Sequence, residues 1–169
     1  MPKTALVVTV PEAEPLVSEW RAEYDSSAQR GVPAHITLLY PFAPTENVDD
    51  QLLRRLRELF ESQAPIAFEL PRVARFPKVA WLAPEPSEPF KAMTELIAAR
   101  FPDYPPYEGA HDVVIPHLTV TEGGVELQDE VEAALTEHLP IAARADDVAF
   151  LFEGDDGLWR EAHRFPLSD

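Results

Sequence analysis

The chain has 169 residues, no cysteine, and a formal net charge of −16 from 30 acidic and 14 basic side chains. The length predicts a single domain, residues 1–169, with a substantial core. Disulfides, thiolate catalysis and cysteine-bound zinc are excluded, and the acidic balance disfavours long nucleic acids, whose binding relies on Lys and Arg contacts to phosphates. No apolar run approaches the roughly 18 residues of a membrane span, and we expect no membrane partner and a cytoplasmic location.

Strands alternate with helices in the first half of the chain. Apolar runs and helical stripes predict, in order, a strand at 5–10, a helix at 11–25, a loop at 26–33, a strand at 35–40, a helix at 49–63, and short strands at 66–70 and 72–76. Pro71 is expected to separate the last two strands, because proline has no N–H to donate to a sheet.

The second half repeats this order. The predicted elements are a strand at 79–83, a helix at 90–100, a strand at 113–121, a helix at 127–139, and strands at 148–153 and 158–165. Pro65-Ile66-Ala67 and Pro140-Ile141-Ala142 follow the second helix of each half. The repeat predicts an α+β, bilobal, pseudo-twofold symmetric fold, in which two mainly antiparallel sheets line a central cleft and the helices cover the outer faces.

One motif, His-apolar-Thr-apolar, occurs once in each half. Its two copies are His35-Ile36-Thr37-Leu38 and His117-Leu118-Thr119-Val120, and each closely follows a proline. Alternate side chains of a strand share a face. The histidine and threonine of each copy are therefore expected to point together, backed by an apolar face that anchors the strand.

These residue types suit acid–base chemistry on a phosphate. Cleavage of a phosphodiester requires one proton to leave the nucleophile and another to reach the leaving oxygen. Histidine suits both tasks because its ordinary pKa of about 6.5 lies near working pH. Threonine hydroxyls can donate hydrogen bonds to the phosphoryl oxygens, where charge must be stabilised. The arrangement requires neither a metal nor a cofactor.

The sequence resembles the 2H phosphoesterase superfamily, and within it the bacterial 2′-5′ RNA ligase-like, cyclic phosphodiesterase branch. The resemblance rests on residues 35–42, 116–120 and 75–82, and the element order fits it over nearly the whole chain. It implies a bilobal fold and metal-independent cleavage or formation of 2′,3′-cyclic or 2′-5′ phosphodiester bonds. In this family His35 and His117 would be the catalytic acid–base pair, with base and acid unassigned, and Thr37 and Thr119 would bind the phosphate.

Further substrate contacts are predicted around the motifs. Tyr40, Phe76 and Trp81 are candidates to stack on a base, and Arg75 and Lys78 to hold a phosphate oxygen. The alternative is that these aromatic rings belong to the core and that the cations keep a strand edge solvated. Relatives that handle RNA tend to have a basic cleft, whereas this chain is strongly acidic, so we expect a small nucleotide or an RNA end as the substrate. We also expect a monomer.

Two other functions fit the same residues. One is a non-catalytic module that binds a nucleotide or another phospho-ligand on the same fold, which the acidic balance favours. The other is a histidine-based metal enzyme. Turnover assays and metal analysis distinguish these alternatives from the paired-histidine enzyme.

Overall fold

Two four-stranded sheets form the framework of the protein. The computed structural model describes residues 2–109 and 114–169. All neighbouring strands in both sheets run antiparallel. The first sheet has the order β2-β1-β7-β8, with bounds His35–Leu39, Thr4–Thr9, Asp147–Glu153 and Trp159–Pro166. The second has the order β5-β4-β3-β6, with bounds Leu118–Glu122, Val79–Glu85, Ile66–Phe76 and Ile141–Ala145.

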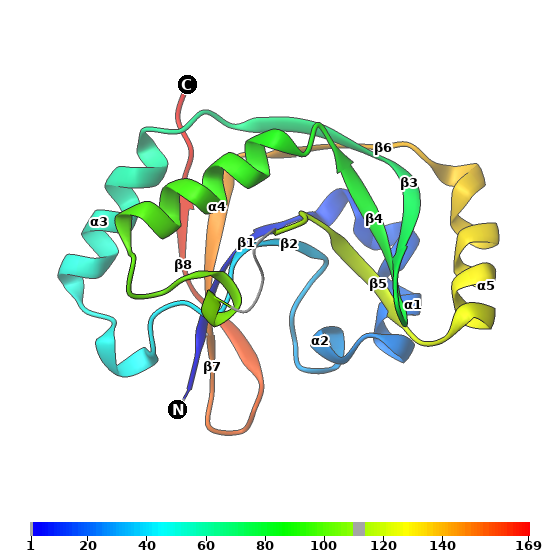
Figure 1. Ribbon diagram of the computed structural model, residues 1–169, viewed down its shortest axis with the longest axis horizontal. Helices are drawn as coiled ribbons and strands as arrows, with labels where there is room; N and C mark the ends of the chain where they lie inside the picture. The colour runs from blue at the N-terminus through cyan, green and yellow to red at the C-terminus, as the bar shows by residue number, and fades with distance from the viewer. Residues whose placement is uncertain (1, 110–113) are drawn as a thin grey trace.

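The two motif strands occupy equivalent places. β2 is an edge strand of the first sheet, β5 is an edge strand of the second, and these two edges contact each other (Figure 1). Opposite them in the same view, β3 and β6 run side by side, and their residues pair in register from Ile66 with Ala145 to Leu70 with Ile141. The motifs therefore meet at the centre of the molecule although they lie far apart in the chain.

The strand registers confirm the predicted pseudo-twofold symmetry. The pairing of β1 with β2 shifts between Leu6 and Val7, and the pairing of β4 with β5 shifts at the corresponding step, between Ala80 and Trp81. Beyond these shifts Val7 lies opposite Thr37, and Trp81 lies opposite Thr119. Each lobe thus uses the same irregular pair of antiparallel strands to present its motif threonine, and the α+β, bilobal prediction is confirmed.

Alternation along β2 holds the motif side chains in place. Ile36 and Leu38 are almost completely buried in the main core, whereas His35 and Thr37, which alternate with them along the strand, are half-buried. Burial of such an aliphatic side chain contributes roughly 1.5–3 kcal/mol. The core face therefore fixes the strand, and the opposite face is left to carry His35 and Thr37. β5 repeats this pattern, with Leu118 and Val120 in the core.

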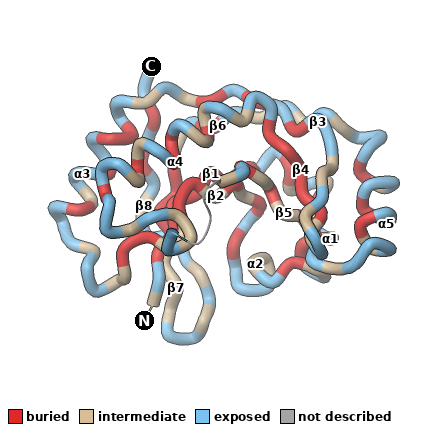
Figure 2. The backbone as a smooth tube through the Cα atoms, viewed as in Figure 1, coloured by how far each residue is buried: buried red, intermediate tan, exposed pale blue. Residues whose placement is uncertain are grey.

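Five α-helices are present among the described residues. Their bounds are Glu14–Tyr24 for α1, Ser26–Gln29 for α2, Asp50–Glu61 for α3, Glu88–Arg100 for α4 and Val125–Leu135 for α5. α3 and α4 contact the first sheet, whereas α1 and α5 contact the second. Figure 2 shows that α3 and α5 are largely exposed on their outer sides, whereas β1 and β4 between them are mostly buried. No described helix is long and apolar enough to span a bilayer.

Several predicted elements need correction. β3 runs unbroken from Ile66 to Phe76, because Pro71 lies in a register shift between Glu69 and Arg72 that accommodates a residue without an N–H donor. The predicted loop 26–33 begins with α2, and β6 was not predicted. The second motif strand begins at Leu118 rather than at residue 113, which lies outside the described residues.

Candidate active site

The imidazoles of the two motifs have the same hydrogen-bonding arrangement. His35 Nδ1 lies 2.8 Å from the carbonyl oxygen of Pro33, and His117 Nδ1 lies 2.7 Å from that of Ile115. A carbonyl oxygen can only accept, so Nδ1 must carry the proton in both rings. In each neutral imidazole Nε2 then has a free lone pair. In the cationic form Nε2 has a proton that it can give.

Burial changes the protonation of both histidines. It lowers the pKa of His35 to about 4, with smaller lowering from the charges of Arg21 and His117, and the hydrogen bond to Pro33 acts in the opposite sense. Burial also lowers the pKa of His117, against the hydrogen bond to Ile115. Both are neutral at pH 7 before a ligand binds.

A cavity of about 280 Å³ opens beside the first motif. His35, Thr37 and Tyr40 line it together with an apolar floor from the first sheet and a rim from the segment 26–32. The other lining residues are Ala5, Val7, Leu151 and Trp159 on the floor and Ser26, Ser27, Arg30 and Val32 on the rim. Tyr40 and Trp159 meet edge to face, with ring centroids 5.9 Å apart. Tyr40 therefore lines the same cavity as His35, and its role in stacking on a base stays a prediction.

The second motif is packed against two of the predicted aromatic residues. The ring centroid of His117 lies 5.2 Å from that of Phe76 and 5.8 Å from that of Trp81, in edge-to-face contacts. Phe76 and Trp81 stack on each other at 4.6 Å. Trp81 Nε1 is buried and has no hydrogen-bond partner among the described residues. These aromatic side chains form a wall beside His117, whereas the smaller Val7 takes the place of Trp81 in the first lobe.

Arg75 is engaged on the α5 side of β3 and Lys78 lies in a surface turn, so binding of a phosphate oxygen by either cation stays a prediction. Arg75 donates hydrogen bonds to Asp129 and Glu132 of α5, at 2.8 and 3.1 Å, on the side covered by that helix. These carboxylates hold the guanidinium away from the face that carries Phe76. Lys78 lies in the exposed turn between β3 and β4, with φ of 63°. Charge patterning along the sequence could not distinguish a cation in a surface ion pair from one in the cleft.

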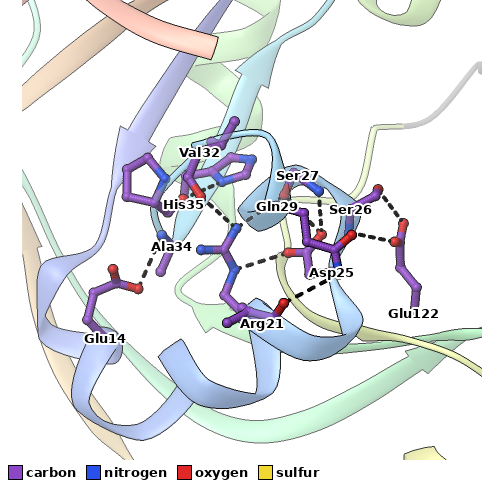
Figure 3. A network of polar contacts seen from close by, with 12 residues as sticks. Glu14, Arg21, Asp25, Ser26, Ser27, Gln29, Val32, Ala34, His35 and Glu122 are labelled. Carbon is purple, nitrogen blue, oxygen red and sulfur yellow. Dashed lines mark hydrogen bonds and ion pairs between the residues drawn. The ribbon is translucent and has the colours of Figure 1, made fainter. Parts of the chain in front are cut away.

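A buried ion pair supports the chain segment before His35 (Figure 3). Arg21 and Asp25, both about 3% exposed in their side chains, lie 3.0 Å apart. Arg21 also donates to the carbonyl oxygen of Val32 at 3.1 Å. Glu14 accepts a hydrogen bond from the Ala34 N–H at 3.3 Å. The peptide that contains Pro33, the partner of His35, is therefore held on both sides by side chains of α1.

The sequence contained a signal for this pair. Val17, Arg21 and Asp25 recur every four residues, so the two charged residues lie on the buried stripe of an amphipathic helix. A charge in such a stripe indicates a buried partner, because an unpaired buried charge is strongly unfavourable. No group of three His, Asp or Glu side chains in the described part of the chain is placed to hold a metal ion.

Comparison with known proteins decides the family. The model of the 2′-5′ RNA ligase superfamily matches residues 9–157, which include both motifs. The chain belongs to this superfamily. A relative from Geobacillus kaustophilus, described as a "Putative phosphoesterase", is 24% identical over 164 residues, and the match covers 93% of this chain and 91% of the relative. A protein of the same name from Bacillus pumilus is 24% identical over 163 residues, covering 91% and 90%.

Solved structures show the same fold. LigT of E. coli complexed with 3′-AMP superimposes with a TM-score of 0.63 at 15% identity and covers both chains completely. The protein TT0787 of Thermus thermophilus gives a TM-score of 0.65 at 19% identity, covering 98% of this chain and 97% of its own. The sequence match thus gives the superfamily, and these structures show that the chain has the fold of LigT.

Proposed function

We propose that this superfamily member cleaves or forms 2′,3′-cyclic or 2′-5′ phosphodiester bonds in a small nucleotide or an RNA end, with His35 and His117 as the acid–base pair. The observation that carries the proposal is the shared arrangement of the two imidazoles. Each donates its Nδ1 proton to a backbone carbonyl, and each belongs to a motif on one of two edge strands in contact. Nε2 of each ring is then the nitrogen that exchanges a proton with the substrate.

In the proposed hydrolysis, the two histidines and one water molecule account for every proton transferred and for the bonds formed and broken at phosphorus. Nε2 of one histidine takes a proton from water as the water oxygen bonds to phosphorus. The bond from phosphorus to the leaving ribose oxygen breaks, and the other histidine gives that oxygen its Nε2 proton. Thr37 and Thr119 donate hydrogen bonds to the non-bridging oxygens, which carry the developing charge. In bond formation the two histidines exchange roles.

The pKa values support a division of these roles. A general base must be unprotonated and a general acid protonated, and the pKa of His35 is lowered to about 4. We assign the base role in hydrolysis to His35 and the acid role to His117. The negative charge of a bound phosphate raises the pKa of a nearby imidazole. Substrate binding is therefore the step that lets His117 hold its proton near neutral pH.

Substitution of the histidines tests this proposal. His35→Ala and His117→Ala are each expected to lower kcat/KM for adenosine 2′,3′-cyclic phosphate by about 10²–10⁴-fold, the usual contribution of a general acid or base. Thr37→Val and Thr119→Val are expected to lower it by about 10²–10³-fold through loss of a hydrogen bond to the phosphoryl group. Product release is measured by chromatography, in buffer with EDTA as well as without it.

The exposed His138, which lies 3.4 Å from Glu137, provides a matched control. His138→Ala is expected to keep full activity. Circular dichroism establishes that each variant is folded. Full activity of folded His35→Ala or His117→Ala would contradict the assigned roles. Nucleotide binding by the native chain without turnover of cyclic or 2′-5′-linked substrates would instead favour a non-catalytic binding module, and loss of activity in EDTA would favour a metal enzyme.

A further inference from the structure

The rim of the cavity is a short segment with a fixed backbone. In the segment 26–32, the Ser27 N–H donates to Asp25 Oδ1 at 3.0 Å, and the Val32 carbonyl accepts from Arg21. The carbonyl of Arg30 accepts from the N–H of Trp159 at 2.8 Å. Gly31 has φ of +94°, and a Cβ there would lie 3.1 Å from the Trp159 carbonyl oxygen, so the turn requires glycine.

The serine side chains of this rim are already paired within the protein. Ser27 Oγ donates to Asp25 at 2.9 Å and accepts from Arg21 at 3.1 Å. The N–H and hydroxyl of Ser26 both donate to the carboxylate of Glu122, at 2.8 and 3.2 Å (Figure 3). Neither serine is therefore free to hold a ligand strongly. Their role is to tie the rim to α1 and to the end of β5.

Arg30 differs from its neighbours on the rim. Its side chain is exposed and lines the cavity, and its guanidinium makes no ion pair or hydrogen bond with any residue the structure describes. Some other surface arginines, such as Arg75 and Arg160, pair with a carboxylate, whereas the side chain of Arg54 has no such partner among the described residues. Among the described residues that line the cavity with His35, Arg30 is the one arginine. In a chain with about twice as many acidic as basic side chains, an unpaired arginine beside His35 is positioned for an anion from outside.

We propose that Arg30 binds a second phosphate of the substrate, separate from the phosphodiester that reacts at the histidines. The inference rests on the proposed function and narrows its substrate class to nucleotides that carry an additional phosphate. The planar guanidinium offers two parallel N–H donors that match a phosphate, and such charge-assisted pairs are strong. The apolar floor and the Tyr40–Trp159 pair line the same cavity, where they contact the nucleoside.

Two substrates that differ in one group test the inference. These are adenosine 2′,3′-cyclic phosphate and the same nucleotide with a 5′-phosphate. The native chain is expected to prefer the 5′-phosphorylated substrate by about 10–100-fold in kcat/KM, the range of a charge-assisted hydrogen bond. Arg30→Gln should reduce that ratio toward one, acting mainly on the phosphorylated substrate. Arg30→Lys should keep part of the preference for the 5′-phosphorylated substrate, because an ammonium keeps the positive charge but lacks the two parallel N–H donors of a guanidinium.

Arg54→Gln is the matched control, since Arg54 is exposed on α3, outside the cavity lining. It should keep both the activity and the ratio of the native chain. Equal activity of the native chain on the two substrates would overturn the inference. An equal loss on both substrates in Arg30→Gln would also overturn it, because Arg30 would then act on the reacting phosphate.

A binding measurement separates failure of this inference from failure of the proposed function. Calorimetry compares adenosine 3′,5′-bisphosphate with adenosine 3′-monophosphate, neither of which needs to react. Tighter binding of the bisphosphate that is lost in Arg30→Gln supports the second phosphate site even if no cyclic substrate is turned over. Turnover of the cyclic substrates without any preference for the bisphosphate supports the chemistry and refutes the site.

Discussion

His35 lies where burial and hydrogen bonding favour different protonation states. Burial lowers its pKa to about 4, and the carbonyl of Pro33 acts against that change by accepting the Nδ1 proton. Burial dominates because the loss of hydration is a penalty on the whole imidazolium charge, whereas the carbonyl satisfies only one of its two donors. The result is a histidine that is held in one tautomer and stays neutral at physiological pH.

This lowered pKa predicts a pH dependence of stability. Between about pH 4 and pH 6.5 the unfolded chain binds a proton at residue 35 that the folded chain does not. The contribution of neutral His35 to the free energy of unfolding is therefore complete above pH 6.5 and falls as the pH drops through this window. In His35→Gln that contribution is absent. The difference in unfolding free energy between the two proteins should change with pH inside the window and stay constant above pH 7.

Urea denaturation at pH 4.5, 5.5 and 7.5 measures this difference, and the carboxylates common to both proteins cancel from it. A difference that stays the same at all three pH values would show that the pKa of His35 is not lowered on folding.

At the scale of elements, α1 and β2 form one unit although α2 and a loop lie between them in the chain. The Arg21–Asp25 pair lies on the buried side of α1 and bonds to the chain that leads into β2. Removal of one partner of a buried ion pair leaves an uncompensated charge, which typically costs about 3–5 kcal/mol. Arg21 is therefore a positioning residue, which acts on the substrate through His35, by holding the segment that precedes it and by the effect of its charge on the pKa of His35.

A double-mutant cycle tests this unit. Arg21→Gln is expected to lower the unfolding free energy by about 3–5 kcal/mol, and the double variant with Asp25→Asn is expected to recover part of the loss. NMR titration of His35 provides the second readout. Because the charge of Arg21 lowers the pKa of His35, that pKa should rise in Arg21→Gln. Additive energies together with an unchanged His35 titration would refute the positioning role.

At the scale of the whole molecule, strands cross between the two repeats. β3 comes from the first half of the chain and lies in the second sheet, whereas β7 and β8 come from the second half and lie in the first. The second sheet is therefore built from four consecutive strands between Ile66 and Ala145, whereas the first sheet combines two strands from each end of the chain. The chain carries a formal net charge of −16, so a long polyanion meets general repulsion even where Arg30 offers a local contact.

That repulsion predicts an unusual response to salt. For an RNA of about 20 nucleotides with a 2′,3′-cyclic end, KM should fall as salt rises from about 50 to 300 mM, because screening weakens the repulsion. Proteins that bind RNA through basic grooves behave in the opposite way, since salt competes with their phosphate contacts. Steady-state kinetics at several salt concentrations measure this, with adenosine 2′,3′-cyclic phosphate as the short control. A steep rise of KM with salt for the long RNA would contradict the prediction.

Local patterns were sufficient for most of the secondary structure. The apolar stripe of α3, with Leu52, Leu56, Leu59 and Phe60 buried, was visible from its spacing, as was the alternation of β2. β6 was not predicted because its run Ile141–Ala145 is short and rich in alanine, so the alternating burial of its residues leaves little alternation between apolar and polar side chains in the sequence. The predicted strand break at Pro71 was wrong because, from the local sequence, a proline at a register shift cannot be distinguished from a proline that ends a strand.

The sequence by itself determined the α+β repeat and the two copies of the motif, because strand alternation and helical spacing are properties of neighbouring residues. Only the tertiary structure decided which side chains share the cavity. It brought Trp159 and Arg30 beside His35, and it turned Arg75 toward α5. Such choices depend on pairing between segments far apart in the chain. The sequence shows an arginine in the same way whether its guanidinium pairs with a surface carboxylate or faces an open cavity, so only the fold distinguishes these two environments.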